Sequence, residues 1–317
     1  MRIQVIVNPN AGRRNIQKQL EKIIGRLFLS GVASDIRVLA TKARQDATKA
    51  AAALLPDQFD LVIACGGDGT INEVINGLMC SGSHIPLAIL AAGTSNDFAT
   101  SLRLPDEADA FCDMVQHGCY RDIDIGCANG RYFINVASFG MFTEVAHNTV
   151  QEQKNVFGLL AYYLQGIKDA PTELASSIPL QICSEEYNAE GDFHLCLVVN
   201  SMSVGSIRKL MYKADVSDGV FDVLLLRKRS RSSALQQRLE QLCRLQPAEL
   251  FARIKSGESD ETARDPLFHY FQTAHIEFTS PVGESVETDL DGEAFGHLPM
   301  TVDVKKQAIR LLIPNNI

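Results

Sequence analysis

The residues best suited to chemistry stand in the segment CGGDGTINEVING, residues 65–77, where an apolar run meets a helical pattern. Gly66, Gly67 and Gly69 carry no Cβ atom, so backbone N–H groups there can approach an anion at the positive end of a helix. The spacing matches neither G-x-x-x-x-G-K-[ST] nor G-x-G-x-x-G, so neither standard nucleotide fingerprint applies. The segment therefore predicts a phosphate cradle of another kind.

Asp68 indicates what this cradle would hold. A carboxylate beside phosphates is repelled unless a divalent cation lies between them, which points to a metal-bound nucleotide. The alternative interpretation is that the aspartate and the glycines only form a tight turn. Two further loops, NPNAG (8–12) and AAGTSNDFA (91–99), favour the nucleotide because they have the same composition and also follow apolar runs.

The elements that position these loops alternate between strand-like and helical patterns from residue 1 to about 127. Strands are predicted over 2–7, 33–39, 60–65 and 87–90, and helices over 15–29, 46–55, 71–79 and 106–116. Such alternation predicts a mostly parallel sheet with helices on both faces. Ligands bind these sheets at the carboxyl ends of the strands, so we expect the three loops to converge on one crevice.

The helix that follows the glycines has a predicted starting point. Thr70 and Glu73 have the S/T-x-x-E spacing of a capping box, in which the two side chains bond the first free amides of a helix. The apolar residues after Thr70 recur at helical spacing. The pattern therefore predicts a helix that begins at Thr70.

After about residue 128 strand-like segments prevail. They cover 132–138, 178–183, 193–200, 220–226, 275–280 and 301–312, with helical patterns near 151–170 and 232–256 and a polar stretch over 256–265 that is the candidate for a mobile loop. We expect a nucleotide-binding α/β domain over 1–127 and a β-rich substrate domain over 128–317. The C-terminal tail, about 305–317, can fold back and become part of the first domain.

Composition restricts the class of protein. The 317 residues carry a formal net charge of −8, which argues against nucleic acid as the main partner because neutralising phosphates needs a basic face. The cysteines include no C-x-x-C pair and no zinc-like spacing, so we expect reduced thiols in a cytosolic protein. The start of the chain does not read as a signal peptide, and no apolar stretch approaches the ~18 residues that span a bilayer, so any membrane contact is expected to be peripheral.

Six segments together resemble the diacylglycerol kinase catalytic-domain family, and within it the soluble bacterial lipid kinases. They are NPNAG (8–12), GGDGTINEVING (66–77), GTSNDFA (93–99), DIDIG (122–126), SDGVFDV (217–223) and DGE (291–293). GGDGT by itself is shared with phosphofructokinases and NAD kinases, whereas the longer motif and the late DGE are more specific. The segments run in the family's order through nearly the whole chain.

The resemblance implies a two-domain kinase: an α/β domain like those of phosphofructokinase and NAD kinase, then a β-sandwich domain, with the active site between them. The residues that it assigns to ATP are Asn8, Pro9, Asn10, Ala11, Gly12, Thr41, Gly66, Gly67, Asp68, Gly69, Thr70, Ile71, Asn72, Glu73 and Thr94. Those that it assigns to the catalytic Mg²⁺ are Asp68, Asp97 and Asp124. Asp218, with the backbone carbonyls of Asp215 and Val220, would hold a structural Mg²⁺.

Phosphoryl transfer to an alcohol also needs an acceptor for the hydroxyl proton. Asp291 and Glu293 are the candidates, and the sequence does not choose between them; Asp68 completes the predicted catalytic set. Taken alone, the pair Asp291–Gly292 is equally typical of a hairpin turn. Together with the other five segments, it favours catalysis.

The leading interpretation is a cytoplasmic, peripherally membrane-associated enzyme that uses ATP to phosphorylate the hydroxyl of diacylglycerol or a related membrane lipid. The alternatives are a soluble-substrate kinase of the NAD-kinase kind and a non-catalytic module that binds nucleotide and lipid.

Three further features bear on membrane contact and assembly. The basic segment RKRSR (227–231) would either bind anionic lipid headgroups or begin a solvated helix. The apolar segment 156–167 would line a lipid entrance or form a core helix. Strand edges in the second domain allow a homodimer.

Overall fold

A computed structural model of the chain describes residues 1–12, 16–55, 57–140, 177–201, 214–228, 268–281 and 285–315. The chain forms two compact units. The first holds Met1–Ile125, Arg131–Ile134 and Lys305–Ile317, and the second holds Gly126–Gly130 and Asn135–Val304. The helical segments predicted near 151–170 and 232–256, including the apolar segment 156–167, and the loop predicted at 256–265 lie outside the described residues.

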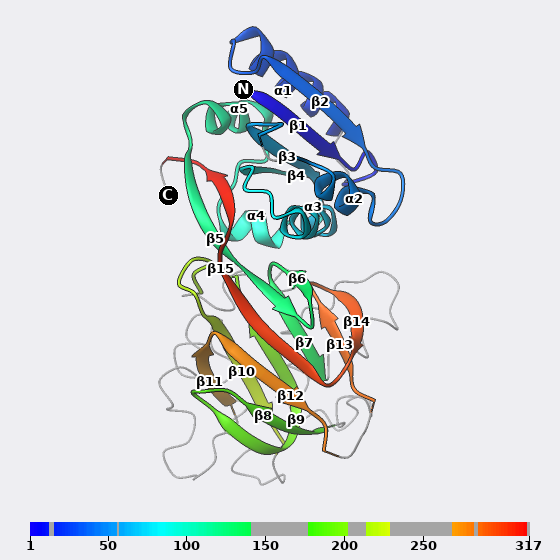
Figure 1. Ribbon diagram of the computed structural model, residues 1–317, viewed down its shortest axis with the longest axis vertical. Coiled ribbons are helices and arrows are strands. Elements are labelled where there is room, and N and C mark those ends of the chain that lie inside the picture. The colour runs from blue at the N-terminus through cyan, green and yellow to red at the C-terminus, as the bar shows by residue number, and fades with distance from the viewer. Residues whose placement is uncertain are drawn as a thin grey trace, which may run out of the picture. The chain divides into compact units, whose positions relative to one another are not determined.

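The first unit is built on parallel strands. They are β1 (Arg2–Val7), β2 (Asp35–Ala40), β3 (Leu61–Gly66) and β4 (Leu87–Ala91), in the spatial order β2-β1-β3-β4 (Figure 1). The end of β15 (Met300–Ile313) pairs in parallel with β4, where Leu311 lies opposite Leu87. β1, β3 and β4 are mostly buried runs of apolar residues, as expected for parallel strands that are covered on both faces, whereas β2 is largely exposed.

Helices connect these strands and cover the sheet. They are α1 (Ile16–Leu29), α2 (Asp46–Ala52), α3 (Asp68–Ser81), α4 (Asp97–Ser101) and α5 (Ala108–His117). α1 and α5 share a core with one set of alternating strand residues, to which they contribute Ile23 and Phe111. α2 and α3 pack so closely that a Cβ atom on Gly77 would lie 2.4 Å from the carbonyl oxygen of Thr48. Strand residues that face away from the first core, such as Ile6, are buried too.

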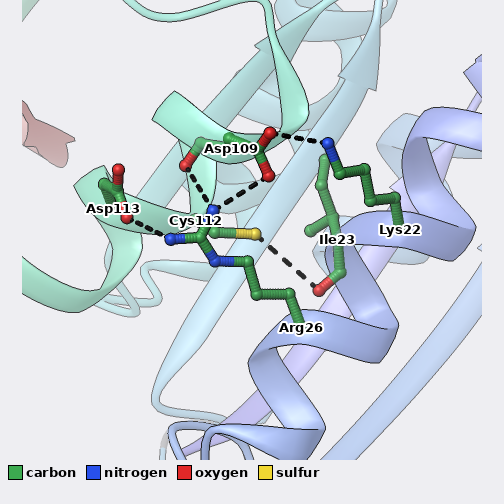
Figure 2. A network of polar contacts seen from close by, with 6 residues as sticks. All are labelled: Lys22, Ile23, Arg26, Asp109, Cys112 and Asp113. Atoms are coloured by element: carbon green, nitrogen blue, oxygen red, sulfur yellow. Dashed lines mark hydrogen bonds and ion pairs between the residues drawn. The ribbon is translucent and has the colours of Figure 1, made fainter.

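Charged side chains join α1 to α5 at the surface of the first unit (Figure 2). Lys22 Nζ lies 2.6 Å from Asp109 Oδ2, and Arg26 contacts both Asp109 and Asp113. The hydrogen bond from Lys22 is the main reason that the pKa of the Asp109 carboxyl is lowered. Exposed ion pairs of this kind contribute little to stability, so the apolar residues beneath them account for most of the packing between the two helices.

The second unit consists of antiparallel strands. They are β7 (Val136–Gly140), β8 (Ile178–Cys183), β9 (Asn188–Val199), β10 (Phe221–Arg227), β11 (Phe268–Thr273), β12 (His275–Thr279), β13 (Glu287–Leu290) and β14 (Glu293–His297), with the start of β15. β9 pairs along its length with β7, β8 and β10. In the core, the rings of Phe139 in β7 and Phe278 in β12 meet edge to face with centroids 4.8 Å apart.

Several strands differ from the prediction. The segment predicted as one strand over 132–138 is two, β6 (Arg131–Phe133) and β7, and the sequence reading did not identify β11, β13 or β14. β5 (Cys119–Ala128) was anticipated only as the DIDIG motif, and the predicted domain boundary after residue 127 lies inside it. β13 and β14 were missed because four or five residues carry too little alternation to distinguish a strand from a turn.

Candidate active site

Three loops at the carboxyl ends of β1, β3 and β4 come together, and glycine is required where they touch. A Cβ atom on Gly12, whose φ is +73°, would lie 1.7 Å from the carbonyl oxygen of Ala92. A Cβ atom on Gly93 would lie 2.6 Å from the Cα atom of Gly67. Real side chains never approach backbone this closely, so only glycine allows the contact. The predicted convergence of the three loops is confirmed.

The predicted start of the helix at Thr70 is wrong, because α3 begins at Asp68. Gly67 is the N-cap residue, in an extended conformation, and no side chain caps the helix. Thr70 cannot serve as the cap because it already lies in the first turn, where its Oγ1 accepts a hydrogen bond of 3.3 Å from Asn8 Nδ2. This bond ties the loop after β1 to the loop after β3.

Glu73, the second member of the predicted capping box, binds a different helix. Its carboxylate accepts the N–H groups of Gln45 at 2.9 Å and Ala47 at 3.2 Å, at the start of α2. First-turn amides of a helix have no partner within the helix, so a neighbouring carboxylate is a natural acceptor for them. Glu73 therefore joins α3 to α2, and its predicted contact with ATP stays a prediction.

The first turn of α3 has room for an anion. A Cβ atom on Gly69 would meet no atom within 4 Å, and α3 is 14 residues long, so its N-terminal amides and dipole favour negative charge in that space. The residues present thus fit the phosphates of a nucleotide. Cys65, just before the glycines, is no nucleophile, because burial raises the pKa of its thiol to about 12.

The three aspartates predicted to surround the catalytic Mg²⁺ have backbone partners. Asp68 accepts the N–H groups of Asp97 at 3.2 Å and Phe98 at 3.4 Å, which brings Asp68 and Asp97 together at the start of α4. Asp124 is buried and accepts the N–H of Gln307 at 2.7 Å. In the described part of the chain, no three acidic, histidine or cysteine residues gather closely enough to hold a metal ion by themselves. Phosphate oxygens and water would complete a Mg²⁺ shell here, as is usual for this ion.

The remaining residues predicted to hold ATP lie on or beside these loops. The exposed ones are Asn10 and Thr94, and the half-buried ones are Asn8, Pro9 and Ala11. Thr41 is buried after β2, where its N–H donates to Val7 O at 2.9 Å. The side chain of Ile71 is buried in the core, and Asn72 Nδ2 lies 3.5 Å from the carbonyl oxygen of Tyr132. These last two side chains therefore support α3 and β6.

The segment DGE forms the turn of the β13–β14 hairpin. Leu290 and Glu293 pair across the hairpin, which leaves Asp291 and Gly292 as a two-residue turn. Their φ angles are +53° and +85°, and positive φ at both positions is what a type I′ turn requires. The hairpin interpretation of this pair is confirmed.

The carboxylate of Asp291 is also held in place by the second unit's backbone. Its Oδ1 accepts the N–H groups of Asn135 at 2.8 Å and Val136 at 2.9 Å, while its own N–H donates to Val136 O at 2.9 Å. Asp291 is half-buried, as is Glu293 in β14. The turn and the catalytic interpretations are therefore compatible, because the turn presents a carboxylate in one fixed orientation.

The loop before β10, predicted to hold a structural Mg²⁺, folds on itself. Asp215 Oδ1 accepts the N–H of Ser217 at 3.0 Å, and Asp218 Oδ1 accepts the N–H of Val220 at 3.2 Å. The carbonyl oxygen of Asp215 accepts the N–H of Asp218 at 3.4 Å. Both aspartates are exposed. A compact loop with exposed oxygens suits a hard cation, and the site stays a prediction.

Comparison with known proteins identifies the family. The family model described as the diacylglycerol kinase catalytic domain matches residues 2–128, and the one described as the YegS C-terminal NAD kinase beta sandwich-like domain matches residues 135–313. A diacylglycerol kinase of Bacillus subtilis is 33% identical over 300 residues, which is 94% of this chain and 91% of that protein. The chain belongs to the diacylglycerol kinase catalytic-domain family.

Other members of the diacylglycerol kinase family agree with this assignment. A diacylglycerol kinase of Staphylococcus saprophyticus is 31% identical over 316 residues, covering 100% of this chain and 96% of that protein. The crystal structure of a Bacillus anthracis protein proposed to be a diacylglycerol kinase aligns with a TM-score of 0.75 at 26% identity, over 100% of this chain and 98% of that chain. The predicted fold class and the predicted enzyme class, a lipid kinase, are confirmed.

Sequence reasoning missed two polar residues of this family member. Asn76 belongs to the long glycine motif but was given no role; its spacing of four from Asn72, which puts both on one face of α3, was the available signal. Asn135 is buried between β6 and β7. Nothing in its local pattern distinguishes it, because its partners come from distant parts of the chain.

Proposed function

We propose that this member of the diacylglycerol kinase family transfers the γ-phosphoryl group of ATP to the hydroxyl of diacylglycerol or a related membrane lipid. The observation that carries the proposal is the convergence of three loops around the open first turn of α3, at Gly69. Phosphoryl transfer depends on positioning and charge stabilisation more than on covalent chemistry, and this turn can supply both. The lipid acceptor is inferred from the relatives, which are diacylglycerol kinases.

In this proposal the phosphates of ATP lie against the N-terminal amides of α3. Asp68, Asp97 and Asp124 would hold a Mg²⁺ ion together with water, and that ion would neutralise the phosphate charge. The packed glycines of the three loops keep side chains out of the space and hold the amides in place before the nucleotide binds.

We assign the proton acceptor to Asp291 rather than Glu293, because two backbone amides fix the orientation of its carboxylate. A positioned general base contributes about 10²- to 10⁴-fold to the rate, so Asp291→Asn should lower kcat by that range with little change in nucleotide affinity. Glu293→Gln is the matched control and should retain most of the activity. A larger loss in Glu293→Gln than in Asp291→Asn would reverse the assignment.

The function is tested by incubating the protein with ATP, Mg²⁺ and a panel of lipids in mixed micelles, with NAD⁺ in a parallel reaction. A phosphorylated diacylglycerol or related lipid is the expected product. Transfer of a labelled γ-phosphate from ATP to NAD⁺ alone would support the soluble-substrate alternative. Asp68→Ala serves as the control for turnover, and equal ATP consumption by the variant and the wild type would remove Asp68 from the mechanism.

A lipid acceptor implies peripheral contact with a bilayer. Among the helices that the structure describes, none is long and apolar enough to cross one. Of the basic segment RKRSR, only the first two residues are described: Arg227 lies over the Phe193 ring and Lys228 pairs with Asp192 at 3.5 Å. Cosedimentation with anionic and neutral vesicles measures the proposed contact, and sedimentation of the protein alone measures the proposed homodimer.

A further inference from the structure

Basic residues are concentrated on the first unit, on the part of β15 that runs beside β5 (Figure 1). Residues 305–317 contain Lys305, Lys306 and Arg310 and neither aspartate nor glutamate, although the whole chain has a formal net charge of −8. All three basic side chains are exposed. These three residues are called the β15 patch below.

The backbone of β15 allows two consecutive lysines to reach solvent together. Side chains normally alternate between the two faces of a strand, but residues 305–307 are all exposed. Gln307 has a φ of +50°, and its N–H donates to Asp124 Oδ1 at 2.7 Å. A left-handed residue within a strand interrupts the alternation and changes the direction of nearby side chains. The exposure of both Lys305 and Lys306 therefore follows from a backbone feature that a buried carboxylate holds in place.

The β15 patch keeps its positive charge because no carboxylate neutralises it. None of its three side chains forms an ion pair with any of the described residues. β5 presents one exposed carboxylate, Asp122, which leaves an excess of cations. Several other basic residues of the first unit are paired with aspartates, namely Arg2, Lys22, Arg26 and Arg37.

An exposed aromatic residue borders the β15 patch. The guanidinium carbon of Arg310 lies 4.9 Å from the centroid of the Tyr120 ring, and Tyr120 is 42% exposed. The ring's quadrupole attracts the cation, so Arg310 is positioned without a carboxylate. Tyrosine is enriched at membrane–water interfaces because its ring is apolar and its hydroxyl is polar. The patch therefore combines positive charge with an interfacial side chain.

We propose that the β15 patch is a docking surface for the anionic headgroups of a lipid bilayer. An anionic membrane surface attracts basic residues that lie within about one Debye length, so a local cluster can bind it although the whole protein is acidic. Nucleic acid is a less suitable partner, since three cations neutralise few phosphates and the rest of the chain would be repelled. The choice of a bilayer rests on the proposed function, in which the substrate is a membrane lipid.

The experiment measures cosedimentation with vesicles of phosphatidylcholine alone and of phosphatidylcholine mixed with an equal amount of phosphatidylglycerol, without ATP or diacylglycerol. It compares Lys305→Ser/Lys306→Ser with Lys42→Ser/Lys49→Ser. Lys42 and Lys49 are exposed in the same unit, so the control removes the same charge from α2 and the loop before it. A difference between the two variants therefore reports the position of the cations and not the net charge.

The wild type should bind the anionic vesicles more tightly than the neutral ones, and the difference should vanish near about 1 M salt, where the Debye length is roughly 3 Å. Each basic residue near an anionic surface contributes about fivefold to binding, so Lys305→Ser/Lys306→Ser should bind anionic vesicles roughly 20- to 30-fold more weakly. Lys42→Ser/Lys49→Ser should stay within about twofold of wild type, because the charge of Asp46 already interacts with both lysines.

Arg310 provides a second, independent test. Arg310→Lys keeps the charge and loses the planar group over Tyr120, so it should bind anionic vesicles within about threefold of wild type. Arg310→Gln removes the charge and should bind about fivefold more weakly. Thermal unfolding of each variant is measured alongside, so that weaker binding is compared only between folded proteins. Equal weakening by the lysine and the glutamine would contradict a role for the charge of Arg310.

Three further outcomes would overturn the proposal. Equal weakening in the two double variants would attribute binding to net charge. Equal binding of the wild type to neutral and anionic vesicles would show that headgroup charge is not recognised. Binding to a short DNA duplex that Lys305→Ser/Lys306→Ser loses, without binding to anionic vesicles, would assign the patch to nucleic acid.

Activity measurements separate this inference from the proposed function. Vesicle binding needs no substrate, so it is decided even if the wild type phosphorylates no lipid. With a short-chain diacylglycerol in free solution, Lys305→Ser/Lys306→Ser should keep a kcat near that of wild type, because the β15 patch is proposed to bind the bilayer and not the reacting groups. With diacylglycerol in anionic vesicles, its KM should rise. A loss of kcat on the dissolved substrate would place these lysines in the reaction and contradict a docking role.

Discussion

At the scale of single residues, the glycines of the three loops serve two different purposes. Gly12 and Gly93 are needed because backbone from another loop occupies the position of their Cβ atoms. Gly69 has no such neighbour, and its φ angle is not in the left-handed region. The packing of the protein therefore does not require glycine at position 69, and the proposed approach of a phosphate to the backbone there would supply the reason for it.

Replacing Gly69 by alanine should separate folding from nucleotide binding. Glycine inside a helix costs roughly 0.5–1 kcal/mol relative to alanine, so Gly69→Ala should keep or slightly raise the unfolding midpoint. Because the new methyl group points into the proposed phosphate space, the Kd for ATP should rise by about tenfold or more. Calorimetry measures both quantities.

Gly12→Ala provides the contrast, because its methyl group would collide with the carbonyl oxygen of Ala92 at a backbone conformation that alanine disfavours. It should lower the unfolding midpoint strongly. If Gly69→Ala binds ATP as tightly as wild type, the phosphates do not lie beside that residue.

At the scale of elements, a histidine joins the paired strands β12 and β15. His275 Nδ1 lies 2.8 Å from Asp303 Oδ1 on β15, and Nε2 lies 3.5 Å from Glu277 on its own strand. The hydrogen bond to Asp303 is the main cause of the raised pKa of His275, and the charges of both carboxylates add to it. The imidazolium form is thus favoured in the folded protein.

This arrangement predicts a pH dependence of stability. A raised pKa in the folded state stabilises the protein fully below the unfolded value of about 6.5, and the contribution disappears as the pH rises through the folded value. Because His275 is half exposed, solvent screening keeps the effect below about 1 kcal/mol. His275→Gln should therefore lower the free energy of unfolding at pH 5.5 and have a smaller effect at pH 8.

Urea titrations at the two pH values measure this difference, with His297→Gln in β14 as the histidine control. An equal effect of His275→Gln at pH 5.5 and pH 8 would mean that the pair with Asp303 does not depend on the charge of the imidazole.

At the scale of the whole molecule, the first unit depends on both ends of the chain. Leu311 of β15 pairs opposite Leu87, and Leu312 is buried in the core with α1 and α5. Gln307 supplies the amide that binds the buried Asp124. The last residues of the sequence are therefore part of a unit that begins at residue 1.

A fragment of residues 1–134 should accordingly be unstable by itself. Full burial of a leucine contributes about 1.5–3 kcal/mol, so losing Leu311 and Leu312 removes a large part of the 5–15 kcal/mol typical of a domain. The same fragment joined to residues 305–317 by a flexible Gly/Ser linker should regain a cooperative thermal transition. Equal unfolding midpoints for the two fragments would contradict the role of the C-terminal strand.

Two Mg²⁺ sites should be distinguishable by their effect on unfolding. A ligand that binds only the folded state raises its stability by mass action. Without nucleotide, Mg²⁺ should raise the unfolding midpoint of the wild type and of Asp68→Ala, but much less that of Asp218→Ala. Conversely, Asp68→Ala should lose the further rise caused by adding ATP. Identical responses of both variants to Mg²⁺ alone would exclude a separate structural site.

The amino-acid sequence by itself determined the local elements and the family. β1 and β8 have the predicted bounds, because each is a strand of six residues with an apolar pattern that ends at turn residues. The glycine loops were recognised for a similar reason: a turn that must approach an anion depends on the residues of the turn itself. The order of the motifs along the chain then identified a lipid kinase fold before any contact was known.

Only the tertiary structure decided which group each polar side chain binds. Thr70 and Glu73 have the spacing of a capping box, yet Thr70 binds Asn8 and Glu73 binds the first amides of α2. Asp291 forms a turn and also orders Asn135, which is distant in sequence. A carboxylate bonds whichever unsatisfied amides the folded chain brings nearest, and this depends on the packing of whole elements, which no local spacing encodes.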